Sequence, residues 1–183
     1  MYLLEVDPLD LGSDIKAVGL ELIHPQSREP VRGAEAARVW AAALQALAGA
    51  EPWGLDCFSH LERVRQSCGL HAVPFREAAA RSLVIPMPET GALAAFFERF
   101  EGETFGARAG SGIQSPDTQV EAELAQRGVD GYHAAFSRYF FCAVCDFENG
   151  FLTLLSNRLW AGEVARRLTP ALKDLTVRVQ LPV

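Results

Sequence analysis

The C-terminal part of the chain, from residue 139 onward, constrains the fold more tightly than any other segment. Two β-prone runs, YFFCAVCDF and FLTLLS, flank Asn149-Gly150, a dipeptide that readily supplies the two positive-φ residues of a type I′ hairpin turn. Apolar residues then recur at helical spacing, at Leu159, Val164, Leu168 and Leu172. The closing segment LTVRVQLPV alternates apolar and polar residues, as a half-buried strand does. This pattern predicts a strand-strand-helix-strand unit.

The rest of the chain adds further helices and strands. Apolar periodicity and capping residues predict helices over residues 34–48, 56–68, 89–100 and 115–127. Strands are predicted over residues 3–6, 15–23, 82–86 and 133–147. We therefore predict a single α+β domain over residues 1–183, with a mainly antiparallel sheet of about six strands and helices packed on it.

The composition is that of a globular protein. Hydrophobic residues make up 49% and charged residues 22% of the 183 residues, which excludes a disordered chain. The formal net charge of −6 argues against nucleic-acid binding, because contact with a phosphate backbone needs a basic face.

The segment MYLLEVDPLDLGSD predicts a cytoplasmic location. It carries acidic residues at Glu5, Asp7 and Asp10 and lacks the basic region and the long apolar stretch of a secretory signal. No apolar run has the length needed to span a bilayer, so no membrane association is expected.

Charge is distributed unevenly along the chain. From residue 150 onward five basic residues stand against two acidic ones, which leaves +3 there and −9 on the remainder. The five are Arg158, Arg166, Arg167, Lys173 and Arg178. They form either a solvated helix face with an edge strand or a local basic patch for an acidic partner.

The cysteine and histidine spacings raise the hypothesis of a zinc site. The C-x-x-H spacing occurs twice and C-x-x-C once, at Cys57–His60, Cys68–His71 and Cys142–Cys145. A single helix over residues 56–68 would hold its two cysteines about 16 Å apart, too far for one ion with Zn–S bonds of about 2.3 Å. Strand residues three apart point to opposite faces. We therefore predict buried thiols, with no metal and no cofactor.

The glycine-rich stretch at residues 105–115 is the remaining candidate for a ligand site. Its sequence GARAGSG lacks the lysine-serine or lysine-threonine ending of a P-loop. Its glycines predict a flexible loop, in which Arg108 could meet an anion. Asp146 and Glu148 share a strand face and could form a carboxylate pair, although acidic residues are common at hairpin tips. We assign no catalytic residue.

Two hypotheses for function follow. The first is a non-catalytic protein-binding module: an acidic cytoplasmic immunity or antitoxin-like protein, or an assembly adaptor. Tryptophan and arginine dominate interface energetics, so the candidate binding residues are Trp53, Arg108, Trp160, Arg166 and Arg167. The alternative is a small enzyme or ligand-binding domain with its site under the loop at 105–115. Neither the partner nor the oligomeric state follows from the sequence.

Overall fold

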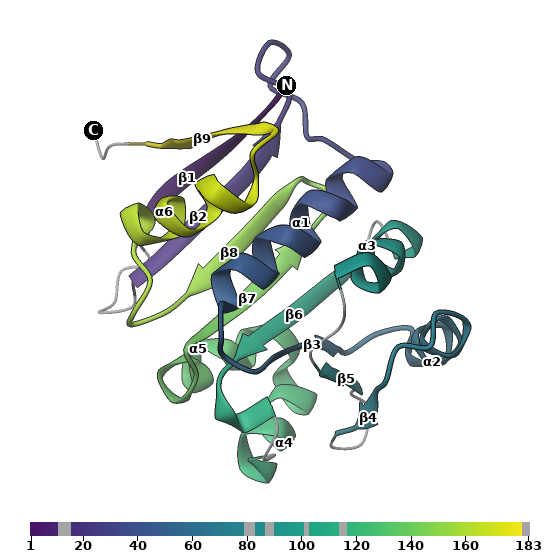
Figure 1. Ribbon diagram of the computed structural model, residues 1–183. Coiled ribbons are helices and arrows are strands. Elements are labelled where there is room, and N and C mark those ends of the chain that lie inside the picture. The colour runs from purple at the N-terminus through teal and green to yellow at the C-terminus, as the bar shows by residue number, and fades with distance from the viewer. Residues whose placement is uncertain (11–15, 79–82, 87–89, 101–102, 114–116, 181–183) are drawn as a thin grey trace.

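The chain folds around one nine-stranded sheet in a computed structural model that describes residues 1–10, 16–78, 83–86, 90–100, 103–113 and 117–180 (Figure 1). The strands are β1 (Tyr2–Asp10), β2 (Lys16–Ile23), β3 (Trp53–Cys57), β4 (Arg76–Glu77), β5 (Leu83–Pro86), β6 (Thr104–Ala109), β7 (Phe141–Asp146), β8 (Phe151–Leu155) and β9 (Leu175–Val179). The helices are α1 (Gly33–Ala48), α2 (Leu61–Leu70), α3 (Thr90–Arg99), α4 (Thr118–Arg127), α5 (Tyr132–Ala135) and α6 (Ala161–Ala171). Short 3-10 turns are η1 (Ser111–Ile113), η2 (Gly128–Gly131) and η3 (Phe136–Arg138).

The sheet is larger than the sequence predicted, and it is mixed. Its strand order is β4-β5-β3-β6-β7-β8-β2-β1-β9. Every neighbouring pair is antiparallel except β1 and β9, which run parallel. The α+β class is confirmed, and most strand pairs are antiparallel as predicted. The predicted size of about six strands is wrong, and the parallel β1–β9 pair was not predicted. The predicted C-terminal unit is present as β7, β8, α6 and β9.

The main core lies between the sheet and the layer of α1, α3 and α6, which stands in front of it in Figure 1. Helix α1 forms where the alanine-rich predicted helix was expected, and it ends at Gly49, whose φ is 63°. Its Trp40 is fully buried and stacks on Phe147 with ring centroids 5.5 Å apart. Phe97 of α3 meets the edge of the same Phe147 ring. Full burial of one such side chain stabilises the fold by about 1.5–3 kcal/mol.

The opposite face of the sheet is only half covered. Helix α4 begins at Asp117, whose side chain accepts the backbone N–H groups of Gln119 and Val120. From there to η3 the chain packs on this face through a small second cluster of buried side chains. The cluster consists of Ala17, Val120, Leu124, Tyr132, Ala135, Tyr139, Cys142 and Leu155. Toward the other ends of β7, β8, β2 and β1, the side chains of this face are partly exposed.

Three local predictions are wrong. Residues 56 and 57 end strand β3, so the expected helix starts only at Leu61. The predicted strand over 133–147 is helical at first, as α5 and η3, and becomes strand β7 at Phe141. The predicted glycine-rich loop is strand β6 as far as Ala109, followed by η1; residues 114 and 115 lie outside the described residues.

The β7–β8 turn also differs from the prediction. Gly150 has φ 66°, but Asn149 is not among the described non-glycine residues with positive φ. The Gly150 N–H donates to the carbonyl of Phe147 over 3.3 Å. The connection is thus a turn that ends in one left-handed glycine, not a type I′ turn with two left-handed residues.

No helix within the described ranges is both long enough and apolar enough to cross a lipid bilayer.

Candidate protein-binding surface

A row of paired residues crosses the uncovered part of the sheet. Asp146 of β7 pairs with Phe151 of β8, which pairs with Glu21 of β2. Glu21 pairs in turn with Glu5 of β1, and Glu5 lies beside Arg178 of β9. Directly paired residues share a face of a sheet. Five adjacent strands therefore present one row on the face of the sheet opposite the main core.

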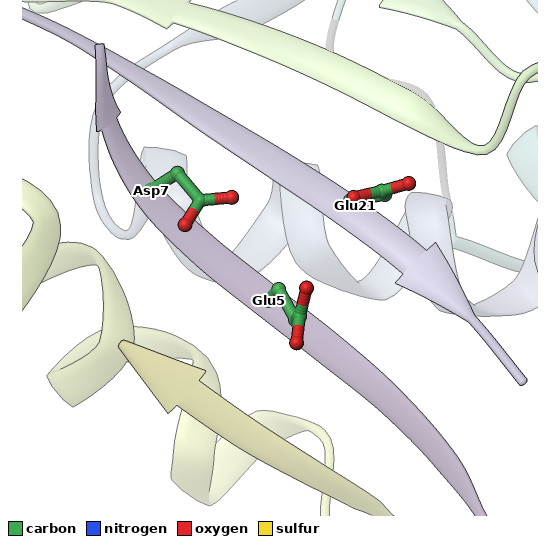
Figure 2. Close-up of side chains that lie close together, drawn as sticks. All are labelled: Glu5, Asp7 and Glu21. Carbon is green, nitrogen blue, oxygen red and sulfur yellow. The ribbon is translucent and has the colours of Figure 1, made fainter. Parts of the chain in front are cut away.

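Three carboxylates gather in this region. Glu5, Asp7 and Glu21 place side-chain oxygens within 4.8 Å of one another. Figure 2 shows the three side chains on β1 and β2, on the side of the strands away from the helix drawn behind them. Glu5 is only 2% exposed, whereas Asp7 and Glu21 are partly open to solvent. We call these three residues the acidic cluster.

One guanidinium engages one member of the cluster. Arg28 follows β2 and reaches back over β1, where its Nη1 and Nη2 donate to the two oxygens of Glu5 over 2.8 and 2.6 Å. Arg28 has φ 64°, which is uncommon for a non-glycine residue. Hydrogen bonds from Arg28 lower the pKa of Glu5, against the opposing effect of its burial. Glu5 therefore stays ionised at pH values below those at which a carboxyl group usually titrates.

The other two carboxylates have no such partner. Among the described residues, neither the Asp7 nor the Glu21 side chain has a hydrogen-bond or ion-pair partner. Burial raises the pKa of Asp7, and the negative charge of Glu5 raises it further. Like charges placed directly opposite each other in a sheet destabilise it, and Glu21 lies directly opposite Glu5. Three carboxylates therefore face two guanidinium groups, that of Arg28 and, beside Glu5, that of Arg178.

The arrangement suits a cationic ligand better than proton transfer. Carboxylates pair with guanidinium groups in planar, two-bond geometry, as Arg28 and Glu5 already do. Oxygen ligands also suit Mg²⁺ or Ca²⁺, but a metal ion would have to displace Arg28 from Glu5 to use all three carboxylates. A partner's arginine or lysine needs only Asp7 and Glu21.

A second group of charges lies buried beneath α4 and α5. Arg108 of β6 donates to both oxygens of Asp56 on β3, over 2.6 and 2.7 Å, and to the Tyr139 hydroxyl over 2.6 Å. The Tyr132 hydroxyl donates to Asp56 over 2.5 Å. Burial alone would lower the pKa of Arg108, but the charge of Asp56 outweighs it and raises that pKa. Arg108 therefore stays charged.

Helix α4 contributes the outer members of this network. Glu121 lies 3.6 Å from Arg108 and accepts a hydrogen bond of 3.0 Å from Arg76 of β4. Arg76 is the member nearest to solvent, with 27% of its side chain exposed. The network joins the sheet to the α4–α5 layer.

The structure places the predicted binding residues in two groups. Trp160, Arg166 and Arg167 lie at α6, and Trp160 is 58% exposed. Trp53 is 2% exposed and donates its indole N–H to Gln45, while Arg108 is fully buried in the network described above. Strand pairing sets Gly54, which follows Trp53, opposite Arg108. The two groups approach each other through Phe140: the Arg167 guanidinium lies over its ring, and the Phe140 backbone N–H donates to the carbonyl of Ala109, the strand partner of Trp53.

The cysteines lie in the core as free thiols. All four are buried, and burial raises the pKa of each, to about 11 at Cys68. Cys142 and Cys145 belong to the clusters on opposite faces of the sheet. Thiols with such pKa values are poor nucleophiles at neutral pH.

The acidic cluster was not among the residues selected from the sequence. The alternation of Leu3, Glu5, Asp7 and Leu9 indicates that these residues share a face. It does not reveal that Glu21 lies opposite Glu5, because that pairing depends on the length and path of the β1–β2 connection.

Comparison with protein-family models, curated proteins and solved structures gives no match for this chain. Function is therefore argued from its own geometry and chemistry.

Proposed function

We propose that the protein is a non-catalytic protein-binding module whose acidic cluster docks the basic side chains of a partner protein. The observation that carries the proposal concerns Asp7 and Glu21, which lie beside an already ionised Glu5 and interact electrostatically with Arg28. Among the described residues, neither has a hydrogen-bond or ion-pair partner. Each lies on the uncovered part of the sheet, where a partner can reach it.

Like charges that lie close together without neutralisation lower the stability of a fold. Conflicts of this kind concentrate at functional sites, where they cost stability in the free protein. A partner's guanidinium between Asp7 and Glu21 would relieve the repulsion, as Arg28 does at Glu5. The relief would appear as binding energy.

The surroundings of the cluster suit a protein surface. Phe151 lies over Gly19, where an added Cβ would meet the ring edge at 3.0 Å, and it is partly exposed next to Glu21. Aromatic side chains are enriched at interface centres. The net charge of −6 would also speed encounter with a basic partner.

Other features support a role without chemistry. The four buried thiols are protonated at neutral pH. Two surface grooves formed by described residues, of about 280 and 340 Å³, contain neither Arg108 nor a carboxylate beside a histidine. The alternative hypothesis places a site under a loop at residues 105–115. Residues 105–109 belong to strand β6, so this part of the segment is not a loop.

The test compares two variants that lose the same charge. Asp7→Asn/Glu21→Gln removes the unpaired carboxylates, and Glu98→Gln/Asp130→Asn removes two exposed carboxylates elsewhere. A synthetic nona-arginine peptide serves as the cationic probe, and calorimetry at low and high salt measures its affinity. We expect the first variant to weaken binding at least ~10-fold, or ~1.4 kcal/mol, and the control to weaken it less than ~3-fold.

Two results would overturn the proposal. Equal weakening in both variants would mean that the peptide senses only net charge. Tight binding of Ca²⁺ or Mg²⁺ that depends on Asp7 and Glu21, without peptide binding, would make the cluster a metal site instead. Cross-linking of the native protein in its own cells, with mass spectrometry, then tests whether a basic protein cross-links next to β1 and β2.

A further inference from the structure

The start of α6 exposes an aromatic side chain that the core does not use. Trp40 and Trp53 are buried, but Trp160 is 58% exposed. Its indole lies along the first turn of the helix, where an added Cβ on Gly162 would stand 3.4 Å from Nε1. The ring thus rests on a small residue and keeps one side toward solvent. A single exposed apolar side chain is common on protein surfaces, so what Trp160 does depends on the charged residues around it.

Three arginines lie within seven residues of this tryptophan in the sequence, at positions 158, 166 and 167. Arg166 shares a helix face with Gly162, four residues earlier, and it donates to both oxygens of Glu163 over 2.7 Å. Arg167 donates to Glu163 and to the carbonyl of Leu47, both over 2.9 Å. Hydrogen bonds from these two arginines lower the pKa of Glu163 to about 2. Glu163 therefore stays ionised, and it holds both guanidinium groups in place.

Arg158 adds a positive charge without an ion pair. Its guanidinium lies 5.9 Å from the centroid of Phe140, and that of Arg167 lies 5.0 Å from the same centroid. Among the described residues no carboxylate forms a salt bridge with Arg158. Three arginines against the single Glu163 leave this region positive on a chain whose total charge is −6.

We propose that Arg158, Trp160 and Arg166 form a second docking surface, which binds an acidic protein segment with an apolar side chain among its carboxylates. The carboxylates would pair with Arg158 and with the outer edge of Arg166, and the apolar side chain would cover Trp160. Tryptophan and arginine are the residues most often found at interface centres. Charge complementarity decides the sign of the partner, since the patch is positive where the remainder of the chain is negative.

This surface is independent of the acidic cluster. Helix α6 packs on the same side of the sheet as α1, whereas Glu5, Asp7 and Glu21 lie on the other side. One chain could thus hold a basic partner on one side and an acidic partner on the other. That is the geometry of an adaptor, and it goes beyond a single docking site.

A nucleic-acid partner is the competing possibility for a basic patch. Nonspecific binding of a phosphate backbone needs a row of many cations, and this patch offers two exposed arginines and the half-buried Arg167. The fixed pair with Glu163 also occupies the inner edge of Arg166. A short peptide with two or three carboxylates matches the patch better.

The test uses a synthetic glutamate-rich peptide with one leucine and one phenylalanine at its centre. The chain has three tryptophans, so its ¹⁵N spectrum has three indole N–H signals. The variant Trp160→Phe assigns the signal of Trp160. We expect the Trp160 signal alone to shift on titration. Arg158→Gln/Arg166→Gln and Trp160→Ala should each weaken binding at least ~10-fold. The matched control Arg32→Gln/Arg38→Gln, on exposed residues near the start of α1, should weaken binding less than ~3-fold.

Three results would overturn this proposal. The first is an unmoved Trp160 signal, and the second is equal weakening in the control. The third is tighter binding of a single-stranded oligonucleotide than of the peptide. Sedimentation tests a second copy as the occupant, because self-association that Asp7→Asn/Glu21→Gln abolishes would assign the patch to another molecule of this chain. Failure here leaves the nona-arginine result at the acidic cluster unaffected.

Discussion

Replacing Arg108 should lower the free energy of unfolding more than replacing a residue on the surface does. In Arg108→Met, the Asp56 carboxylate loses both hydrogen bonds from the guanidinium while it is only 2% exposed, and the Tyr132 hydroxyl is its remaining donor in the network. Tyr139 also loses the guanidinium that donates to it. Breaking a buried ion pair by removing one partner costs about 3–5 kcal/mol, because the other charge remains uncompensated.

Urea denaturation followed by circular dichroism measures this cost. With a slope of about 1–3 kcal/mol per molar urea, the midpoint should fall by at least about 1 M. Arg127→Met is the control, because Arg127 is exposed and pairs only with Glu123 on the helix surface. Its stability should change by less than about 0.5 kcal/mol.

A double variant tests whether the loss comes from the stranded charge. In Arg108→Met/Asp56→Leu both charges are gone, and an apolar pair of similar volume takes their place. Its loss should be about 1–3 kcal/mol smaller than the sum of the two single losses. Strict additivity, or an Arg108→Met variant within about 1 kcal/mol of the parent, would refute the view that this pair fixes α4 and α5 on the sheet.

Three further predictions concern other positions. Gly106→Ala should destabilise the fold by at least ~2 kcal/mol, since its Cβ would lie 1.8 Å from the Tyr132 hydroxyl oxygen; a thermal melt within 2–3 °C of the parent contradicts this contact. Gly150→Val should cost at least ~1 kcal/mol, because φ is 66° and a Cβ would meet the Leu22 carbonyl at 2.9 Å; an unchanged urea midpoint would mean the turn is built otherwise. Asp7→Asn/Glu21→Gln should stabilise the free protein by ~0.2–1 kcal/mol at pH 7. The folded-state pKa of Asp7 is raised, so its penalty is present at neutral pH and fades as pH falls through that pKa; denaturation curves at pH 7 and pH 4 should show the variant's advantage only at pH 7.

Local signals were enough to predict the C-terminal unit and the helix over 34–48. That helix carries its apolar stripe and its terminating Gly49 within one stretch of sequence. The β7–β8 pair likewise needs only two β-prone runs and a glycine between them. Such elements depend on neighbours in sequence, and single-sequence patterns capture them.

The wrong predictions involve residues whose role depends on contacts with residues distant in the sequence. Gly106 looked like a loop residue, but it is glycine because Tyr132 lies against it in a central strand. Asp56 looked like a helix cap, but its carboxylate is needed for Arg108 on the neighbouring strand. In both cases tertiary packing overrode local propensity.

The same holds for the candidate sites. Trp160 and Arg166 could be selected as candidates because a tryptophan and arginines stand close together in the sequence at α6. The acidic cluster could not, because its charge balance depends on the reach of Arg28 across β1 and on the pairing of Glu21 with Glu5. Sequence alternation indicated a polar face there, but not an unneutralised one.

The position of β1 and β2 within the sheet has a consequence for the time course of synthesis. The two strands leave the ribosome before β8 and β9, but β2 pairs on its far side with β8, and β1 pairs on its far side with β9. Phe151 is made roughly 130 residues after its partner Glu21, and at about 5–20 residues per second this is a delay on the order of ten seconds. During that interval both edges of the nascent hairpin are open to pairing with other chains. Translation speed and early chaperone capture should therefore influence how much of this protein reaches its native sheet, more strongly than its equilibrium stability would suggest.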